Sequence, residues 1–527
     1  MLGDLASLRG LGLDVGASAP IGLMVPKGAH FTAEASRPSS GPNGVNGGIA
    51  HGVPRESEVG QRRNKGDAQQ TKPPKAAATP VVLAAAPPAA AAMHEAKTLP
   101  PTQPLPTDET SVSCISYNVL LPNSKDGWWI YKYYRDPGDG AIAAWPHRQN
   151  LLKEYFLTSS ADFVCLQECS ELSFDEDFAF LREVGYEGVL LNKGRMRAAS
   201  FWKGERWEQV SAQHKDRTLV MAMRRLSGPL VGAVLFVLNA HLAAGPNADR
   251  RLRQAVEALS AAAKEAKRLG LDPSCTPMIF AGDLNSMGRT AVREFLVAGE
   301  VGPEFRESGD PTEKGQAGKT ITSKVRRQDF GPFLDAGEVC MGDDSGHPTI
   351  LAATLDSKML SDDGVPTPAL LAAVNAAFDR CRGSAASPDE LTRAEVEQYL
   401  MRVNKELGRG SEYRFAMAAM EKRGSDTFSR EDFVALYAAE LAEGKFWGVE
   451  HDLRVLNGEG LSVPSEGPCA LCFDHIFFTP ERLQLLGVQE PLTDEQRRRI
   501  YQEPWEVLPN SWHPSDHLPV AALFRLA

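Results

Sequence analysis

The feature that most constrains the fold is a set of apolar, strand-like runs, each followed at once by a polar residue. Three of these runs deliver Glu168, His241 and Asp283. Apolar runs of this length with β-branched and aromatic residues are typical of strands buried in a sheet. Asn285 follows Asp283 by two residues, a spacing that places both side chains on one face of an extended chain. The sequence therefore predicts sheets whose edge gathers carboxylate, imidazole and amide groups.

Two further segments near the C-terminus follow the same pattern. Asp474 lies within the aromatic run 471–478, and Asp516 and His517 directly precede the last apolar run. A single polar residue at a strand end is usually a helix cap or a solvated loop residue. Five such sites in one chain are harder to explain in that way. Together they supply oxygen ligands for a hard metal ion, an orienting amide and two imidazoles, a set suited to phosphate ester hydrolysis.

The periodicity of the chain predicts an α+β fold with one helical insertion. Strands are expected at 112–117, 162–167, 187–191, 218–223, 231–239, 277–281, 472–478 and 518–524, with helices at 148–157 and 249–269. Residues 365–450 are rich in Ala, Glu and Leu and show almost no strand signal, and helices are expected there at 391–403, 411–422 and 430–445. A helical block between two β-rich parts indicates an insertion.

The first 108 residues differ in composition from the rest of the chain. They contain one aromatic residue, Phe31, and many Pro, Gly and Ala residues. Such a segment buries too little apolar area to offset the entropy of ordering it, so we expect a disordered tail. The whole chain has a net charge of −11. An acidic chain is a poor general binder of polyanions, so any nucleic-acid chemistry requires a local basic site or a metal ion.

Cysteine usage and hydropathy bear on the compartment. Eight cysteines in 527 residues are typical of a reducing compartment, which favours an intracellular, cytoplasmic protein. The uncharged stretch 76–93 contains Pro80, Pro87 and Pro88, which break a helix, so no membrane-spanning segment is expected. No clear signal peptide is found, and a poorly patterned organelle transit peptide stays an alternative.

These motifs, taken together and in order, resemble the endonuclease/exonuclease/phosphatase superfamily, which has the deoxyribonuclease-I-like fold. The matching segments are 116–118 (SYN), 166–168 (LQE), 239–242 (NAHL), 282–286 (GDLNS), 473–476 (FDHI) and 515–517 (SDH). Any one of them is a weak signal, whereas six in the family's order are specific. The resemblance implies a four-layer αββα sandwich, two sheets flanked by helices, with Mg²⁺ (or Mn²⁺) at the sheet edge.

The resemblance also implies a role for each matching residue. Glu168 is expected to be the main metal ligand, with Asn118 and Asp516 close to it. Asp283 would orient or deprotonate the attacking water, and Asn285 would help to hold that water and a phosphoryl oxygen. The imidazoles of His241 and His517 would donate hydrogen bonds to the phosphate as negative charge builds up. Asp474 would bind His517 and fix its tautomer.

Other residues bear on the substrate. Trp145 and Arg148 stand before a helix as in the deadenylase and nocturnin-like branch, whereas 472–475 (CFDH) departs from the motif of inositol-polyphosphate 5-phosphatases. We expect Arg148, Arg197, Lys215 and Arg217 to contact substrate, with ordinary surface charge as the alternative. The aromatic segment 127–134 (GWWIYKYY) suits either base stacking or a packed loop core, and the sequence does not separate the two.

The helical block resembles a degenerate pair of EF-hands. The loop 421–432 has Glu421, Arg423 and Ser425 at positions one, three and five, and Asp426 rather than Gly at position six. The loop 384–395 keeps Glu395 at its end but begins with a serine. A working loop requires Asp at one, Gly at six and Glu at twelve, so we expect weak or no Ca²⁺ binding. Nuclease-like halves around such a region resemble a calcium-binding endonuclease/exonuclease/phosphatase family of plants and algae.

The sequence thus predicts four parts: a disordered tail (1–108), a first catalytic part (109–360), a helical EF-hand-like insertion (361–455) and a second catalytic part (456–527). The expected activity is Mg²⁺-dependent hydrolysis of a phosphoric ester, with RNA or a nucleotide as the favoured substrate. Hydrolysis of an inositol phosphate or phospholipid is the first alternative. An inactive calcium-responsive scaffold that binds a protein partner through the insertion is the second.

Overall fold

The computed structural model describes most of the chain from Ala96 onward. The described residues are 96–526 without 102, 106–107, 135–139, 246, 308–319, 342–347, 356–358, 360, 362–364, 384–386, 443–444, 462–463 and 503–505. Residues 1–95 of the expected disordered tail lie outside them. The described residues belong to one unit of contacting residues.

The last residues of the expected tail are part of the fold, which corrects the predicted boundary at 108. Strand β1 (Lys97–Leu99) pairs in parallel with β18 (Leu483–Gln489). Leu105 is buried, and its backbone N–H donates to the carbonyl of Ser159 at 2.9 Å. A three-residue edge strand is held by its partner strand, and its own sequence carries almost no periodic signal.

Seven strands form the first sheet, in the order β1-β18-β19-β2-β3-β5-β4. Besides β1 and β18, they are β19 (Val520–Leu526), β2 (Ser111–Asn118), β3 (Phe163–Cys169), β5 (Arg197–Lys203) and β4 (Tyr186–Leu190). The central strands β2 and β3 are parallel, with Ser116 opposite Cys165. Their carboxyl ends, at Asn118 and Glu168, therefore meet at one edge.

Six strands form the second sheet, in the order β12-β17-β9-β8-β7-β6. They are β12 (Leu334–Asp335), β17 (Asp474–Phe478), β9 (Met278–Asp283), β8 (Val234–His241), β7 (Thr218–Arg225) and β6 (Trp207–His214). The parallel pair β8 and β9 places His241 opposite Asp283. The antiparallel pair β9 and β17 places Asp283 opposite Asp474.

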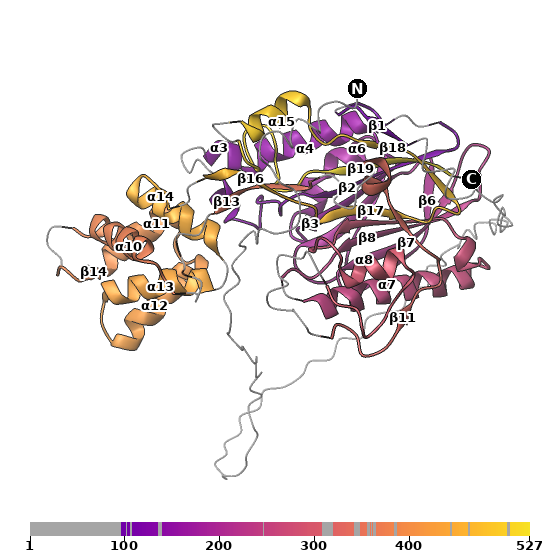
Figure 1. Cartoon of the computed structure of the whole chain (residues 1–527). Coiled ribbons are helices and arrows are strands. Elements are labelled where there is room, and N and C mark those ends of the chain that lie inside the picture. The colour runs from indigo at the N-terminus through magenta and orange to yellow at the C-terminus, as the bar shows by residue number, and fades with distance from the viewer. Residues whose placement is uncertain are drawn as a thin grey trace, which may run out of the picture. The chain divides into compact units, whose positions relative to one another are not determined.

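The two sheets pack face to face, and helices cover their outer faces, so the fold is the expected four-layer αββα sandwich of the α+β class (Figure 1). Alternation along each strand produces these layers. On β2, Cys114 packs between the sheets with Val237 and Ile279. On the same strand, Ile115 faces outward against Phe156 of helix α4.

The outer helices differ in length on the two faces. The first sheet is covered by α4 (Trp145–Ser159) and two short helices, α5 (Phe174–Asp177) and α6 (Ala179–Glu183). The second is covered by α7 (Ala248–Arg268) and α8 (Ala291–Val297). Helix α7 follows the prediction closely because its apolar residues recur at helical spacing along its whole length.

Smaller elements connect these layers. They are α3 (Gly140–Ala143), α9 (Ala336–Met341), α15 (Asp494–Tyr501), the 3₁₀ turns η1 (Ile130–Tyr133) and η2 (Pro273–Cys275), and the strand pair β10 (Glu300–Val301) and β11 (Arg326–Arg327). Among the described residues, no helix has both the length and the apolar character needed to cross a membrane.

The helical block has its own apolar core. It contains α10 (Pro368–Cys381), α11 (Arg393–Asn404), α12 (Gly410–Arg423), α13 (Arg430–Ala442) and α14 (Phe446–Asn457), the orange helices of Figure 1. Strands β13 (Ile350–Leu355) and β16 (Pro464–Leu471) flank the block and pair antiparallel. Within it, β14 (Glu390–Thr392) and β15 (Thr427–Ser429) pair with Leu391 opposite Phe428.

Candidate active site

Strand ends from both sheets gather the predicted polar residues at one place. The amide of Asn118, at the end of β2, donates to Asp283 Oδ2 at 3.0 Å. Asn118 belongs to the first sheet and Asp283 to the second, so this hydrogen bond joins the two sheets at the site. Both side chains are about 1 % exposed. Burial of two polar side chains requires such pairing, because an unpaired buried polar group costs free energy.

Glu168 reaches the site through an irregularity in β3. The pairing of β3 with β5 shifts register between Leu166 and Cys169, and Glu168 has a positive φ of 64°. A bulge of this kind redirects one side chain relative to the pleat. Glu168 Oε1 lies 3.4 Å from the amide nitrogen of Asn118 and 3.9 Å from His241 Nε2. The side chain is 17 % exposed, so solvent reaches this carboxylate.

Local turn geometry fixes the carboxylate of Asp283. Its two oxygens accept from the backbone N–H of Asn285 at 2.7 Å and from the Asn285 amide at 3.3 Å. Gly282 permits the close approach of the neighbouring strand, because a Cβ there would lie 2.0 Å from the carbonyl oxygen of Ala240. Asn285 also donates to the carbonyl of Leu242 at 3.1 Å. Asn285 has a φ of 50° and lies beyond the end of β9, so the two side chains meet through a turn, whereas their spacing predicted a shared face on an extended chain.

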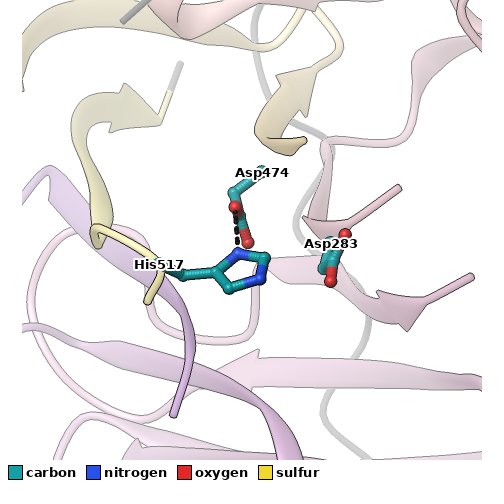
Figure 2. A group of neighbouring side chains, drawn as sticks. All are labelled: Asp283, Asp474 and His517. Atoms are coloured by element: carbon teal, nitrogen blue, oxygen red, sulfur yellow. Dashed lines mark hydrogen bonds and ion pairs between the residues drawn. The ribbon is translucent and has the colours of Figure 1, made fainter. Parts of the chain in front are cut away.

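The imidazole of His517 forms a short hydrogen bond with a buried carboxylate. His517 Nδ1 lies 2.7 Å from Asp474 Oδ2, and Figure 2 shows the two side chains together with Asp283. Thr349 Oγ1 accepts from the backbone N–H of Asp474 at 3.1 Å. Ser515 Oγ accepts from the N–H of His517 and donates to the carbonyl of Asn118. These contacts leave His517 Nε2 as the nitrogen available to a substrate.

The charges of these groups shift one another's pKa values. Burial, and then the negative charge of Asp474, raise the pKa of Asp283. Burial opposes the charged form of His517, but Asp474, Asp516 and Asp283 together raise the pKa of that imidazole well above its usual value. Burial and the neighbouring Glu168 raise the pKa of Asp516, although His517 acts in the opposite direction. Groups with displaced pKa values in one cluster are typical of functional sites.

His241 is oriented by the backbone. Its Nδ1 donates to the carbonyl of Met196 at 3.2 Å, which leaves Nε2 facing the carboxylates. Nε2 lies 3.7 Å from Asp283 Oδ2. In this tautomer the ring donates a hydrogen bond from Nε2 only when it is charged.

Beneath these groups, a buried amide pair connects the two sheets. Gln167 of β3 donates to Asn239 Oδ1 at 2.9 Å. The Asn239 amide in turn donates to the carbonyls of Leu166 and Ala199. Both amide side chains are fully buried. This hydrogen bond links β3 of the first sheet to β8 of the second beneath the site, although Gln167 Oε1 has no hydrogen-bond partner among the described residues.

The expected substrate contact by Arg148 is corrected. Its side chain is fully buried, and it donates to the carbonyls of Val119, Leu120 and Pro514 at 2.6, 2.5 and 2.8 Å. Carbonyls of the backbone after β2 and of the loop before His517 accept the hydrogen bonds of its guanidinium. Arg148 therefore holds these two segments of the site together. A guanidinium with five donors is suited to tie several carbonyls together.

The other three predicted basic residues lie in different surroundings. Arg197 forms an ion pair with Glu171 and donates to two backbone carbonyls, so its donors are used locally. Lys215 and Arg217 are half-buried in the turn between β6 and β7. The carbonyl of Arg217 accepts from the backbone N–H of His241 at 3.0 Å, which places this turn beside the site.

Three residues near the site were not predicted from the sequence. Thr349 and Met196 act through one oxygen each, and neither belongs to a motif. Tyr133 is the third: burial and the negative charges of Asp516 and Glu168 raise the pKa of its phenol. The only sequence signal for Tyr133 was that it belongs to the aromatic segment 127–134, which is suited to base stacking.

The fold and the site together define a hydrolase that acts on phosphate esters. The model of the endonuclease/exonuclease/phosphatase family matches residues 115–517, and the chain belongs to that family.

Curated relatives cover a smaller part of the chain. The CCR4-Not complex 3′-5′-exoribonuclease subunit Ccr4 of Mycosarcoma maydis is 24 % identical over 250 residues, 37 % of this chain and 36 % of that protein. The 2′,5′-phosphodiesterase 12 of Rattus norvegicus is 24 % identical over 255 residues, 41 % of this chain and 40 % of that protein. The chain thus matches well under half the length of these relatives.

Solved structures align with a larger part of this chain than the curated relatives do. A structure of ANGEL2, described as a 2′,3′-cyclic phosphatase, aligns with a TM-score of 0.47 at 17 % identity, over 79 % of this chain and 95 % of that one. The catalytic domain of human Nocturnin aligns with a TM-score of 0.37 at 12 % identity, over 81 % of this chain and all of that one.

Proposed function

We propose that this chain is a Mg²⁺-dependent phosphodiesterase whose substrate is RNA or a nucleotide. The observation that carries the proposal is the convergence of eight polar residues from six separate segments at one edge of the two sheets. They are Asn118, Glu168, His241, Asp283, Asn285, Asp474, Asp516 and His517. The set contains carboxylates for a cation, a base for water and two imidazoles for phosphoryl oxygens.

The donor set fits a hard divalent cation. Glu168 would be the main ligand, with Asp516 and the amide of Asn118 beside it, because Mg²⁺ prefers carboxylate and amide oxygens. The cation would supply positive charge that stabilises the phosphate as its negative charge increases. Asp283, Asp474 and His517 also bring ligand-type atoms within 4.8 Å of one another. The hydrogen bond from His517 Nδ1 to Asp474 favours a proton carrier there over a metal ligand.

The remaining residues would act on water and on the phosphate. Asp283, held by Asn118 and Asn285, would accept a proton from the attacking water. His517, kept charged by Asp474, would donate from Nε2 to a phosphoryl oxygen. His241 would face the phosphate with its Nε2 from the other side. Lys215 and Arg217 would contact a neighbouring phosphate of the substrate.

Two of the relatives named above support a nucleic-acid substrate for this chain. One is an exoribonuclease subunit and the other a 2′,5′-phosphodiesterase. The test is a substrate panel of oligo(A), single-stranded DNA, 2′,5′-linked oligo(A), an inositol polyphosphate and sphingomyelin. We expect Mg²⁺-dependent hydrolysis of an oligoribonucleotide, loss of activity in EDTA and recovery on adding Mg²⁺.

The variant Glu168→Ala should lower kcat by about 10³-fold. The variant Glu208→Ala, at a partly buried carboxylate of β6 that pairs with Arg224, is the control and should retain activity. Hydrolysis of inositol phosphate or sphingomyelin alone would assign the site to the alternative substrates. Unchanged hydrolysis by Glu168→Ala would overturn the metal role.

We further propose that the helical block is an EF-hand-like pair without a working Ca²⁺ site. The pairing of β14 with β15 joins two helix–loop–helix units. In the second loop, the guanidinium of Arg423 lies 2.7 Å from the carboxylate of Asp432, the twelfth position. A fixed side-chain cation thus neutralises the carboxylate that a metal would need. Ser384–Ala386 of the first loop lie outside the described residues.

A further inference from the structure

The 3₁₀ turn η1 (Ile130–Tyr133) is held by the helical block through a buried ion cluster. Lys132 Nζ lies 2.8 Å from Glu412 Oε1 of α12 and 3.2 Å from Asp452 Oδ1 of α14, and all three side chains are 7 % exposed or less. Tyr131 donates from its hydroxyl to the carbonyl of Val403 at 2.8 Å. A charge cluster this buried is costly to open, so it ties the turn to helices α12 and α14.

The same segment is anchored on its other side to the backbone of the active site. Ile130 and Tyr134 are buried with Leu120 and Leu121, which follow Asn118 by two and three positions. The segment therefore bridges the helical block and the end of strand β2.

One aromatic side chain of this segment stands apart from both cores. Tyr133 belongs neither to the apolar cluster of its own segment nor to that of the helices, among the described residues. Its ring lies beside that of Trp447 in the first turn of α14, with centroids 6.5 Å apart and planes at 27°. Both rings are partly exposed. Tyr133 precedes Tyr134, which packs against Leu120 and Leu121 after strand β2. Burial and the negative charges of Asp516 and Glu168 raise the pKa of the Tyr133 phenol, so Tyr133 lies near the catalytic carboxylates.

We propose that the helical block forms one wall of the substrate site, where Tyr133 and Trp447 make an aromatic platform for a nucleobase next to the reacting phosphate. This inference rests on the proposed function. Two near-parallel, partly exposed rings that belong to no apolar core are suited to stack on the face of a base. Such stacking does not depend on the identity of the base. Lys132 acts as a positioning residue, because its ion cluster sets the place of Trp447 relative to Tyr133.

The test compares a substrate that has bases with one that lacks them. The two probes are a five-nucleotide oligo(A) and the same oligomer made of abasic nucleotides, each at saturating Mg²⁺. For Trp447→Leu we expect KM for oligo(A) to rise about tenfold, with kcat within about twofold, because stacking on an aromatic ring contributes mainly to binding. KM for the abasic oligomer should be unchanged. Trp447→Phe should restore most of the affinity for oligo(A).

The control is Tyr413→Leu, a change at a partly buried residue that packs against the apolar core of the helical block. It should lower the melting temperature without a selective change in KM, and so reports general loosening of the helices. Equal changes on both oligomers for Trp447→Leu, or no change on either, would overturn the platform. Failure of the unaltered protein to hydrolyse any nucleotide substrate would overturn the proposed function and with it this inference. If the unaltered protein hydrolyses oligo(A) and Trp447→Leu shows no selective rise in KM for it, this inference alone is overturned.

Discussion

His517 Nδ1 lies 2.7 Å from a carboxylate oxygen of Asp474, and both side chains are buried. The pair shares its surroundings with Asp283, which stands opposite Asp474 on the neighbouring strand. One carboxylate therefore influences both the group expected to accept a proton and the group expected to carry one.

This relationship predicts the pH profile of the reaction. Asp283 must be ionised and its pKa is raised, so activity should fall on acidification at a pH above that of an ordinary aspartate. His517 must be charged and its pKa is also raised, so the alkaline limb should lie above the pH expected for a free histidine. Asp474→Asn removes the negative charge that raises both pKa values, so both limbs of kcat/KM should move to lower pH.

The control for that profile is Asp335→Asn. Asp335 binds His475 at 2.6 Å on the strand that carries Asp474, but this pair lies outside the proposed mechanism. Its profile should match that of the unaltered protein. If the acidic and alkaline limbs of kcat/KM do not move in Asp474→Asn, Asp474 does not influence Asp283 and His517 in the proposed way.

Arg148 should matter for stability rather than for substrate affinity. Arg148→Ala leaves several buried carbonyls without a donor, so we expect the free energy of unfolding to fall by at least about 3 kcal/mol. Arg148→Lys should recover part of this loss, since an ammonium reaches fewer carbonyls. Denaturant unfolding measures both. Arg195→Ala, at an exposed ion pair with Asp126, should change stability by less than about 1 kcal/mol. A stable Arg148→Ala variant with only a raised KM would restore the substrate role.

Lys215 and Arg217 are expected to bind substrate phosphate. Lys215→Ala and Arg217→Asn should each raise KM about fivefold and reduce the dependence of kcat/KM on salt concentration, because each removes one phosphate contact. Asn is chosen at 217 because the backbone there has a φ of 56°, which Asn tolerates. Arg197→Ala, whose donors are used by Glu171 and carbonyls, is the matched control and should leave KM unchanged. A salt dependence equal in all three variants would exclude the contact.

The helical block should not respond to calcium. Because Arg423 pairs with Asp432, 1 mM CaCl₂ should leave the melting temperature within about 1 °C of its value in EDTA. Arg423→Asp removes the internal cation, but Glu421 at position one and Asp426 at position six still depart from a working loop, so this variant should also show no Ca²⁺-dependent rise in melting temperature. A Ca²⁺-dependent rise in the unaltered protein would show a working site.

Strong local signals explain which elements could be predicted. Strands β8 and β9 and helix α7 were predicted close to their observed bounds, since a continuous apolar run or a long helical period needs no partner to be recognised. Strand β1 was not predicted, and neither was the pairing of β13 with β16 around the helical block. Their residues become strands only when another strand lies beside them.

The same division applies to the site. The sequence by itself determined the family, the αββα class and the chemistry available at the strand ends, because residue types and their order along the chain carry that information. Only the tertiary structure decided what each group faces. It turned Arg148 from a substrate contact into a buried tie between backbone carbonyls, and it placed Trp447, more than 300 positions from Tyr133 in the numbering, against that ring. Such contacts depend on how distant segments pack, and no local pattern in either segment encodes its partner.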